Sequence, residues 1–301
     1  MKGIINVLKP TGMTSHDVVS FIRRTLNIKK VGHTGTLDPN AAGVLPICIG
    51  KATKVSQFLV NKDKKYRAEL TLGQATDTQD KYGEIINETE VNVSEADIRK
   101  VFSKYEGEIY QIPPMFSALK HKGKKLYELA REGKTIEREP RKITIYNLDI
   151  IEIIGNKVLF DVECSKGTYV RTLCSDIGET LKTFGHMSML VRTKVDKFDI
   201  FDAVTLDEIQ KYSQEDNIDL ILKPIDFVLT QYKELILDDE YFEILQNGGR
   251  VFVSNNLPLL KANINESSKV RIYCKNHFIG IGIVKSYNDE KYVKMEKVFL
   301  S

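Results

Sequence analysis

Apolar and polar residues alternate along several segments of this chain with the two-residue period of half-buried strands. The alternation predicts strands at residues 66–72, 143–154 and 157–164. The short segments 4–8 and 44–49 and the segment 187–195 are also interpreted as strands. Gly155 and Asn156 separate the two longest segments and are typical of a tight hairpin turn. Hairpins with helices inserted between the strands favour a mixed, mainly antiparallel sheet over a doubly wound one.

Apolar residues three and four positions apart predict helices between these strands. Thr14 or Ser15 is expected to cap the first helix, and Ser94 with Asp97 matches a capping box. Further helices are expected at residues 51–60, 126–132, after 168, and 206–212. The predicted fold class is therefore α+β, with a sheet flanked by helices.

The last part of the chain has a different pattern. The acidic stretch 202–243 is interpreted as a connector. Short strands with polar turns are then expected at residues 257–260, 269–273, 277–285 and 292–299. We therefore expect a main domain over 1–230, with a basic insertion at 119–142, and a small C-terminal β-barrel over 231–301.

Composition restricts the class of protein further. No apolar run of the 301 residues approaches the roughly 20 residues of a membrane span. The first residues lead straight into a strand pattern without a secretory signal, so we expect a cytoplasmic protein with no membrane association. The four cysteines and five histidines are scattered, which indicates neither a disulfide framework nor a metal site.

Charge is unevenly distributed along the chain. Residues 1–33 carry six Lys or Arg against one acid, and residues 119–142 carry nine against four. Residues 202–243 carry three lysines against twelve acids. This separation is consistent with a polyanion bound along one face, and equally with solvated surface charge that has no partner.

The loop that contains Asp38 is the strongest candidate for chemistry. Asp38 precedes a proline in a run rich in glycine and threonine, so its backbone is expected to be extended rather than helical. The main chain can approach a ligand closely at three glycines of this region, namely Gly32, Gly35 and Gly43. Taken alone, an Asp-Pro pair in such a loop is most often an ordinary turn. The surrounding blocks of sequence decide between the two interpretations.

Six blocks stand in the order and spacing of one known family. They are VLKPTGMTS at 7–15, GHTGTLDP at 32–39, KYR at 65–67, QIPPMFSALK at 111–120, SKGTYVRT at 165–172 and MLVRT at 189–193. Together they resemble the TruB-type tRNA pseudouridine-55 synthases, and the resemblance covers nearly all of residues 3–195. The tail, with NGGR at 247–250, is similar on weaker evidence to the small PUA-type RNA-binding barrel.

The resemblance implies roles for individual residues. Asp38 matches the essential catalytic aspartate, Arg171 the arginine that pairs with it, and Tyr66 the tyrosine that stacks on the target base and is a candidate for proton removal at C5. His33, Tyr169 and Leu190 match substrate-binding positions. Whether Asp38 attacks the sugar carbon or promotes deprotonation there stays open.

Further residues are expected to support the site or bind the RNA backbone. Lys9 and Pro10 are interpreted as structural support behind the loop. The basic insertion resembles the thumb-like arm of the family and offers Lys122, Lys124 and Lys125 to RNA phosphates.

The resemblance implies isomerisation of uridine 55 in the T-loop of tRNA, without a cofactor or a metal. Such an isomerisation needs neither oxidation nor net water, which fits a chain without a nucleotide-binding loop or redox cysteines. The expected partner is the T-stem-loop of tRNA, bound by a monomer with no obligate protein partner. Two alternatives remain: a guide-RNA-dependent relative of the dyskerin type, and a main contribution as an RNA-folding chaperone.

Overall fold

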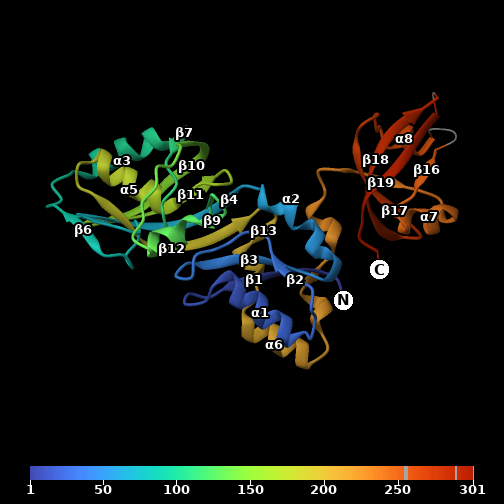
Figure 1. Ribbon diagram of the computed structural model, residues 1–301, viewed down its shortest axis with the longest axis horizontal. Coiled ribbons are helices and arrows are strands. Elements are labelled where there is room, and N and C mark those ends of the chain that lie inside the picture. The colour runs from blue at the N-terminus through green and yellow to red at the C-terminus, as the bar shows by residue number, and fades with distance from the viewer. Residues whose placement is uncertain (254–256, 289, 301) are drawn as a thin grey trace.

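The computed structural model of the protein describes residues 1–253, 257–288 and 290–300. Figure 1 shows a long sheet through the left and centre of the view and a separate sheet on the right, which contains the last strands of the chain. The long sheet has ten strands and the other has five. No helix in the described parts of the chain is both long and apolar enough to cross a membrane.

The strands of the long sheet come from most of the chain. They are β1 (Gly3–Lys9), β2 (Val31–His33), β3 (Ala42–Ile49), β4 (Lys64–Leu72), β7 (Gly107–Gln111), β10 (Arg141–Ile154), β11 (Lys157–Cys164), β12 (Gly185–Val195), β13 (Phe198–Asp199) and β14 (Leu222–Lys223). Two small ladders join β5 (Gln74–Thr76) to β6 (Ile85–Glu88) and β8 (Lys120–His121) to β9 (Lys124–Lys125).

The order of the long sheet is β14-β1-β3-β12-β4-β11-β10-β7, with β2 paired to β3 and β13 paired to β12. Its pairings are antiparallel apart from the short parallel contact between β12 and β3. The predicted mixed, mainly antiparallel sheet is confirmed. Because β12 lies between β3 and β4, it joins the strand that follows the Asp38 loop to the strand that carries Tyr66.

The helices of the main part are α1 (Ser15–Thr25), α2 (Ser56–Val60), α3 (Glu95–Phe102), α4 (Leu126–Arg131), α5 (Val170–Thr180) and α6 (Leu206–Gln214). In Figure 1, α3 and α5 lie along the left half of the sheet, and α1 and α6 lie below its centre. One apolar core joins α3 and α5 to β4, β10 and β11, and another joins α1 and α6 to β1 and β3.

Local capping explains where three of these helices begin. Thr14 accepts a hydrogen bond from the Asp17 backbone N–H, and the Asp17 carboxylate accepts one from the Thr14 backbone in return. Ser94 and Asp97 make the same reciprocal pair at α3, and Thr205 and Glu208 make it at α6. Each box satisfies backbone N–H groups that have no partner inside the helix.

The five-stranded sheet has the order β15-β17-β18-β19-β16. Its strands are β15 (Lys233–Ile236), β16 (Arg250–Phe252), β17 (Lys269–Cys274), β18 (His277–Tyr287) and β19 (Glu290–Val298), with α7 (Phe242–Gln246) and α8 (Leu257–Lys261) between them. Among the described residues no pairing joins β15 to β16, so closure into the expected barrel is not observed.

Three sequence-based predictions need correction. The apolar run 257–260 lies in helix α8 rather than in a strand, because a short apolar run has no period that separates the two. The helix expected at 51–60 starts as the 3₁₀ helix Gly50–Val55 before α2. The stretch 202–243 is more than a connector, since it buries Ile209 and Val228 and pairs β14 with β1.

The two sheets share an apolar contact. Phe278 and Phe299 of the smaller sheet stack at 5.6 Å between ring centroids, and both belong to a cluster that includes Val228 and Leu229. The Lys54 ammonium donates to the Val298 carbonyl at 3.1 Å, across the same junction. The smaller sheet is therefore attached by packing as well as by the chain connection.

Candidate active site

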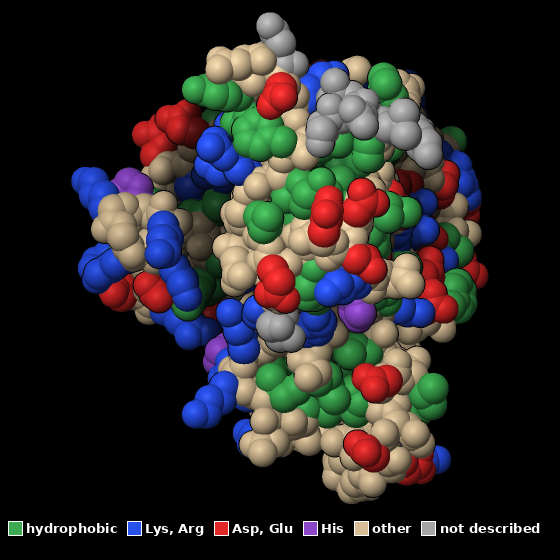
Figure 2. Space-filling view, turned by 90° about the vertical axis from the view of Figure 1, so that its right-hand side faces the viewer, with side chains coloured by type: hydrophobic (Ala, Val, Ile, Leu, Met, Phe, Trp, Pro, Cys, Tyr) green, Lys and Arg blue, Asp and Glu red, His purple; other side chains and the backbone are tan. Residues whose placement is uncertain are grey.

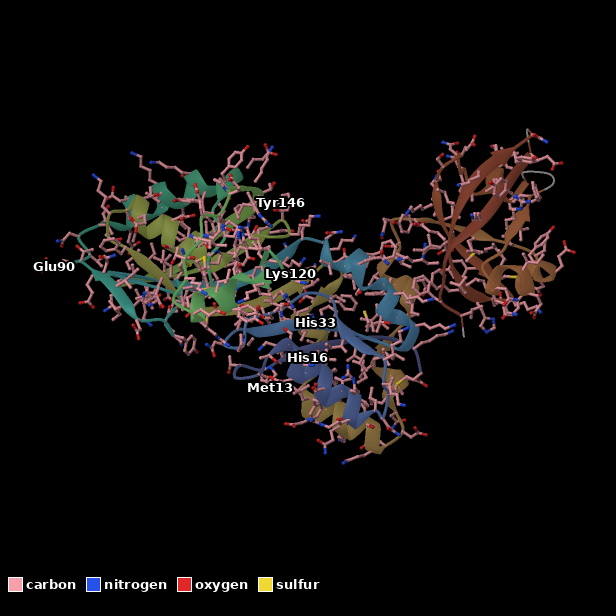
Figure 3. The ribbon with its side chains drawn as sticks, viewed as in Figure 1. Met13, His16, His33, Glu90, Lys120 and Tyr146 are labelled. Carbon is pink, nitrogen blue, oxygen red and sulfur yellow. The ribbon has the colours of Figure 1, made fainter. Side chains whose placement is uncertain are left out.

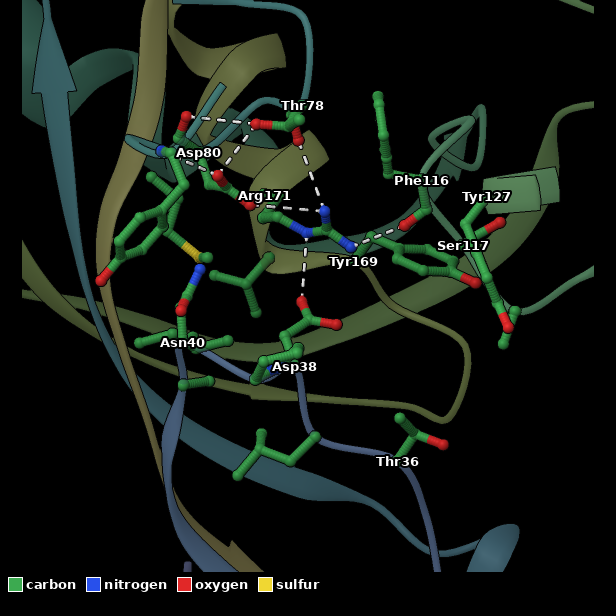
Figure 4. A pocket seen from close by; sticks show the side chains of 18 of the residues that line it. Thr36, Asp38, Asn40, Thr78, Asp80, Phe116, Ser117, Tyr127, Tyr169 and Arg171 are labelled. Atoms are coloured by element: carbon green, nitrogen blue, oxygen red, sulfur yellow. Dashed lines mark hydrogen bonds and ion pairs between the residues drawn. The ribbon is translucent and has the colours of Figure 1, made fainter. Parts of the chain in front are cut away.

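Segments far apart in the sequence enclose one cavity of about 730 Å³. Figure 4 shows its interior, with Asp38 and Asn40 on one side, Arg171 in the middle, and Phe116, Ser117 and Tyr127 on the other. The first wall is the Asp38 loop (residues 34–41), which connects β2 to β3. The cavity lies where that loop, β4, β12, the start of α5 and the segment 116–131 meet.

Asp38 and Arg171 form an ion pair in this cavity. The Arg171 Nε atom lies 3.2 Å from the Asp38 Oδ2 atom. The Arg171 side chain is only 8% exposed, while that of Asp38 is 43% exposed. The carboxylate therefore remains accessible to a ligand, and the buried guanidinium holds it in place through the ion pair.

Three further acceptors hold the Arg171 guanidinium, as the dashed lines of Figure 4 indicate. Its Nη2 donates to the Phe116 carbonyl at 2.9 Å, and its Nη1 donates to the Thr78 carbonyl at 3.4 Å. A second carboxylate, Asp80, lies 3.5 Å from Nη1. The orientation of Arg171 is thus determined by three different segments of the chain before any substrate binds.

Lys9 supports the Asp38 loop from below. Its side chain is fully buried, and its ammonium donates to the carbonyls of Pro10 and Met13 at 2.7 Å and of Pro39 at 3.1 Å. Burial lowers the pKa of Lys9 to about 8, and the nearby Asp38 charge opposes that shift. Pro10 itself is exposed and offers only its carbonyl. Lys9 therefore contacts the loop backbone directly and Pro10 only through Lys9, and neither residue lines the open cavity.

Tyr66 and Leu190 line the cavity from two neighbouring strands. Tyr66 is opposite Arg192 in the β4–β12 register, and Leu190 is opposite Ala68. Burial raises the pKa of the Tyr66 hydroxyl to about 12, although the Arg192 cation acts in the opposite direction. Tyr66 is therefore a neutral phenol at pH 7 and presents an aromatic ring to the cavity.

His33 and His16 also line the cavity, and Figure 3 shows them close together near the middle of the molecule. The His33 Nδ1 atom accepts a hydrogen bond from the Gly35 N–H at 3.3 Å. Burial lowers the pKa of His33, and the Arg192 and His16 charges act in the same direction. His33 is therefore neutral at pH 7 and carries its proton on Nε2, which it can donate.

Tyr169 lies directly before α5, two residues from Arg171. The buried side chain of Gln111 accepts from the Tyr169 N–H at 2.8 Å and donates to the Tyr169 carbonyl at 3.0 Å. Burial raises the pKa of the Tyr169 hydroxyl. This two-point contact connects the end of β7 to the start of α5 and positions both Tyr169 and the arginine that follows it.

The three arm lysines have different surroundings. Lys125 lines the cavity, and its ammonium lies 3.2 Å from the Tyr127 hydroxyl. Lys124 is exposed and pairs with Glu132 at 3.4 Å. Lys122 is exposed at the turn between β8 and β9, where its φ of 48° falls in the left-handed region. Only Lys125 belongs to the cavity wall.

Sequence reasoning missed four residues that hold this site together: Ser15, Asp80, Gln111 and Arg192. The buried Ser15 hydroxyl donates to the Leu37 carbonyl at 3.0 Å and accepts from the Leu37 N–H at 2.8 Å. Ser15, Gln111 and Arg192 stand inside blocks that carried the resemblance, so a signal existed for these three. Asp80 stands in a turn-rich run and gave no such signal.

No group of three or more His, Cys, Asp or Glu side chains in the described residues is placed to hold a metal ion. The four cysteines are buried and unpaired. Burial raises the pKa of Cys48 and of Cys164 to about 12, so both remain thiols at pH 7.

Fold and site together define an α+β protein with one accessible, arginine-paired carboxylate in a cavity. A model of the TruB family pseudouridylate synthase N-terminal domain matches residues 23–170, and a tRNA pseudouridylate synthase B C-terminal domain matches 171–230. The chain belongs to the TruB family of pseudouridylate synthases.

Related proteins and solved structures agree with that assignment. The chain is 52% identical to tRNA pseudouridine synthase B of Alkaliphilus oremlandii over 98% of this chain and 97% of that protein. It is 47% identical to the same-named protein of Clostridioides difficile over the full length of both. A chain of a Cbf5-Nop10-Gar1 complex is similar with a TM-score of 0.74 and 29% identity, covering 99% of this chain and 85% of that one. The predicted pseudouridine-synthase-like fold is confirmed.

Proposed function

We propose that this protein isomerises uridine 55 in the T-loop of tRNA to pseudouridine. The observation that carries the proposal is the ion pair of Asp38 with Arg171 in a cavity that Tyr66 lines. The reaction breaks the C1′–N1 bond, turns the detached uracil and joins C1′ to C5. The C5 proton leaves and N1 gains a proton, so no oxidant and no net water are consumed.

Asp38 is the reacting carboxylate in this proposal. Its accessible side chain can approach the sugar of an extruded nucleotide, while the ion pair with Arg171 fixes its position. Two routes are compatible with this geometry, namely attack on C1′ and deprotonation of the sugar. In both, a single carboxylate suffices because the leaving uracil delocalises its negative charge.

Tyr66, His33, Tyr169 and Leu190 are proposed to bind the extruded nucleotide. Stacking of a base on an aromatic side chain stabilises binding by about 1–3 kcal/mol. Since Tyr66 has a pKa of about 12, it begins the reaction as a phenol that stacks and donates a hydrogen bond. We assign stacking as its first role. In its second role the phenol gives its proton to N1 of the departing uracil, and the phenolate formed then takes the C5 proton, so Tyr66 ends as the phenol it was at the start. Neutral His33 is positioned to donate from Nε2.

Extrusion of a base from a folded loop costs a few kcal/mol, which contacts to the RNA backbone must offset. The arm (residues 119–142) is proposed to supply them through Lys122, Lys124 and Lys125. Residues 119–142 carry nine Lys or Arg against four acids. In Figure 2, Lys and Arg side chains gather at the left edge with a few acidic side chains among them, and both kinds also lie near the centre. The excess of basic residues in the arm supports its proposed role on the RNA path.

We further propose residues 1–230 as the catalytic domain and residues 231–301 as a PUA-like RNA-binding module. The outer face of the smaller sheet supports the second assignment. Phe252 and Tyr292 lie 5.4 Å apart between ring centroids, and the Arg250 guanidinium lies 5.5 and 5.8 Å from their centres. Such a cation–aromatic group suits an unpaired RNA base.

The direct test is to measure pseudouridine in an unmodified tRNA transcript after incubation with the wild-type protein or with Asp38→Asn. We expect product at position 55 from the wild type alone. Equal product from both proteins would exclude the role of Asp38. A folded wild type that binds the transcript and forms no product would exclude the function itself.

We propose that the protein acts as a stand-alone monomer in the cytoplasm, without guide RNA or an obligate protein partner. Relatives named tRNA pseudouridine synthase B match at 52% identity, against 27% for a chain of an H/ACA RNP bound to substrate RNA. Light scattering of the purified protein and activity on naked transcript test this proposal. A requirement for an added guide would favour the guide-dependent alternative.

A tRNA-folding chaperone role is proposed to coexist with catalysis. The observation in its favour is that the reactive carboxylate lies inside a cavity, so the tRNA elbow must open before reaction. Asp38→Asn should then retain its benefit in cells although it forms no product. Loss of that benefit together with the product would leave catalysis as the sole role.

A further inference from the structure

Arg192 is a fully buried cation directly below the Asp38 loop. Its side chain is among the largest fully buried ones in the described residues. Its Nε donates to the Val44 carbonyl at 2.7 Å, and its Nη1 and Nη2 donate to the carbonyls of Thr36 and Gly35 at 3.3 Å. One guanidinium therefore contacts the chain on both sides of Asp38.

The backbone of Arg192 lies at a junction of the same elements. It pairs with Tyr66 across the β12–β4 ladder and with Gly43 across the β12–β3 contact. A Cβ atom at position 43 would lie 2.2 Å from the Arg192 carbonyl oxygen, so only glycine permits this approach. Gly43 is therefore required because it lets β3 approach β12 closely.

The charge of Arg192 reaches several groups of the cavity. It opposes the rise in the pKa of Tyr66, the residue opposite it in the β4–β12 ladder, and it contributes to the lowered pKa of His33. The acceptors of its three hydrogen bonds are main-chain carbonyls, and none is a carboxylate. A buried charge held by neutral dipoles keeps more of its field than one neutralised by a salt bridge.

We propose that Arg192 is a positioning residue of the reaction: it fixes the Asp38 loop against β12 and orients the Tyr66 hydroxyl toward the uracil. The inference rests on the proposed roles of Asp38 and Tyr66. Arg171 holds the carboxylate from the front, and Arg192 holds the backbone that carries it from below. Rigid placement matters because small displacements of a reacting group slow a reaction strongly.

A second consequence concerns the detached base. Once the C1′–N1 bond breaks, the uracil carries negative charge until C1′ joins C5. The Arg192 cation is present beneath the site before this charge develops, so no reorganisation is needed when it forms. Tyr66 is opposite Arg192 in the β4–β12 ladder, and its hydroxyl can carry this polarisation to the base by a hydrogen bond.

The experiment compares Arg192→Met and Arg192→Lys with wild type in single-turnover reactions on unmodified tRNA transcript, alongside the Kd for the same RNA. Loss of one preorganised donor slows the chemical step by about 100-fold or more, and we expect this for Arg192→Met. Arg192→Lys keeps the positive charge but not the planar guanidinium with its several donors, and its single-turnover rate should be about tenfold lower than that of the wild type. The Kd should change less than about threefold in both, since phosphate contacts dominate RNA affinity.

Lys194→Met serves as the matched control. Lys194 lies on the same strand, 41% exposed, and pairs with Asp199 at 3.8 Å. It should keep the wild-type rate. A wild-type rate in folded Arg192→Met would overturn the inference, and so would a loss that appears only in Kd. A wild type without activity would instead contradict the proposed function, which keeps the two failures distinct.

A double-mutant cycle with Tyr66→Phe covers the case in which Arg192→Met fails to fold. Because Arg192→Lys retains the buried charge, the cycle uses this variant. If Arg192 acts through Tyr66, the rate losses of the two single variants should not multiply in the double variant. Multiplicative losses within about twofold would show that the two residues act independently and would overturn the connection through Tyr66.

Discussion

The Asp38 loop and the arm face the same cavity but are held in opposite ways. Buried polar side chains fix the loop through its main chain: Lys9, Ser15 and Arg192. The arm exposes its lysines, and its short helix α4 buries little beyond Leu126 and Leu129. The proposed reacting carboxylate thus lies on the wall that buried polar contacts hold, and the proposed RNA-binding lysines lie on the more exposed one. Such a difference is expected where chemistry needs fixed geometry and a large ligand must enter.

The largest effect should come from Arg171→Met, on the rigid side. Loss of the cation leaves Asp38 without its ion pair, and we expect the single-turnover rate to fall about 1,000-fold with little change in Kd. Arg67→Met removes another Arg–Asp pair, at 2.8 Å from Asp161 but about half exposed, and should keep the rate. A loss below tenfold for Arg171→Met would mean that Asp38 does not depend on this arginine.

The next effect concerns stability. Lys9→Met removes a buried ammonium and its hydrogen bonds to three partly buried carbonyls, and we expect the free energy of unfolding to fall by about 3 kcal/mol at pH 7. Lys9 is mostly charged at that pH because its pKa is about 8. Lys122→Met, in the exposed arm turn, should change it by less than about 0.5 kcal/mol. Urea unfolding of both variants measures the difference, and equal values would contradict the contrast between the two walls.

A smaller effect is expected from the arm. Changing Lys122, Lys124 and Lys125 together to Gln should weaken tRNA binding about tenfold at low salt. It should also reduce the slope of log Kd against log salt by ~0.9 for each RNA phosphate that the variant no longer binds. The rate of the reaction on RNA that is already bound should not change. As a control, three lysines of the acidic stretch 202–243 are changed to Gln: Lys211, Lys223 and Lys233. This variant should have the same slope as the wild type. An unchanged slope in the arm variant would place the arm off the RNA path.

The smallest effect is expected from a substitution of Asp176, behind the base of the arm. Arg138 and Asp176 line a second cavity there, of about 560 Å³, and burial raises the pKa of Asp176 to about 6. Because the pKa of Asp176 is higher in the folded protein than the value near 3.8 expected in the unfolded chain, protonation of Asp176 favours the folded state. This contribution to stability is fully present below pH 3.8 and is lost as the pH rises through 6.

Asp176→Asn should therefore stabilise the protein by about 1 kcal/mol at pH 7, after allowance for solvent screening. The gain should vanish near pH 3, where wild-type Asp176 is protonated in the folded state and largely so in the unfolded one. Thermal unfolding across this pH range is the measurement, with exposed Glu152→Gln as the control. A gain that is independent of pH would show that the titration of Asp176 is not its cause.

Much of the fold could be predicted because the deciding signals are local. Thr14 and Ser94 cap helices as expected, and the hairpin at Gly155 pairs β10 with β11. The error at 257–260 has a local origin too, since four apolar residues show no period. Closure of the last strands into a barrel depends on pairings between distant residues, which no local pattern reveals.

The sequence by itself determined the helix caps, the hairpin, the family and the set of candidate side chains, because those depend on neighbouring residues or on ordered motifs. Only the tertiary structure decided that Arg171 meets both Asp38 and Asp80, and that Arg192 lies buried beneath the loop. These contacts depend on the order of strands in the sheet, which places β12 between β3 and β4. The same ordering defines the Asp38 loop as one wall of a site completed by distant parts of the chain.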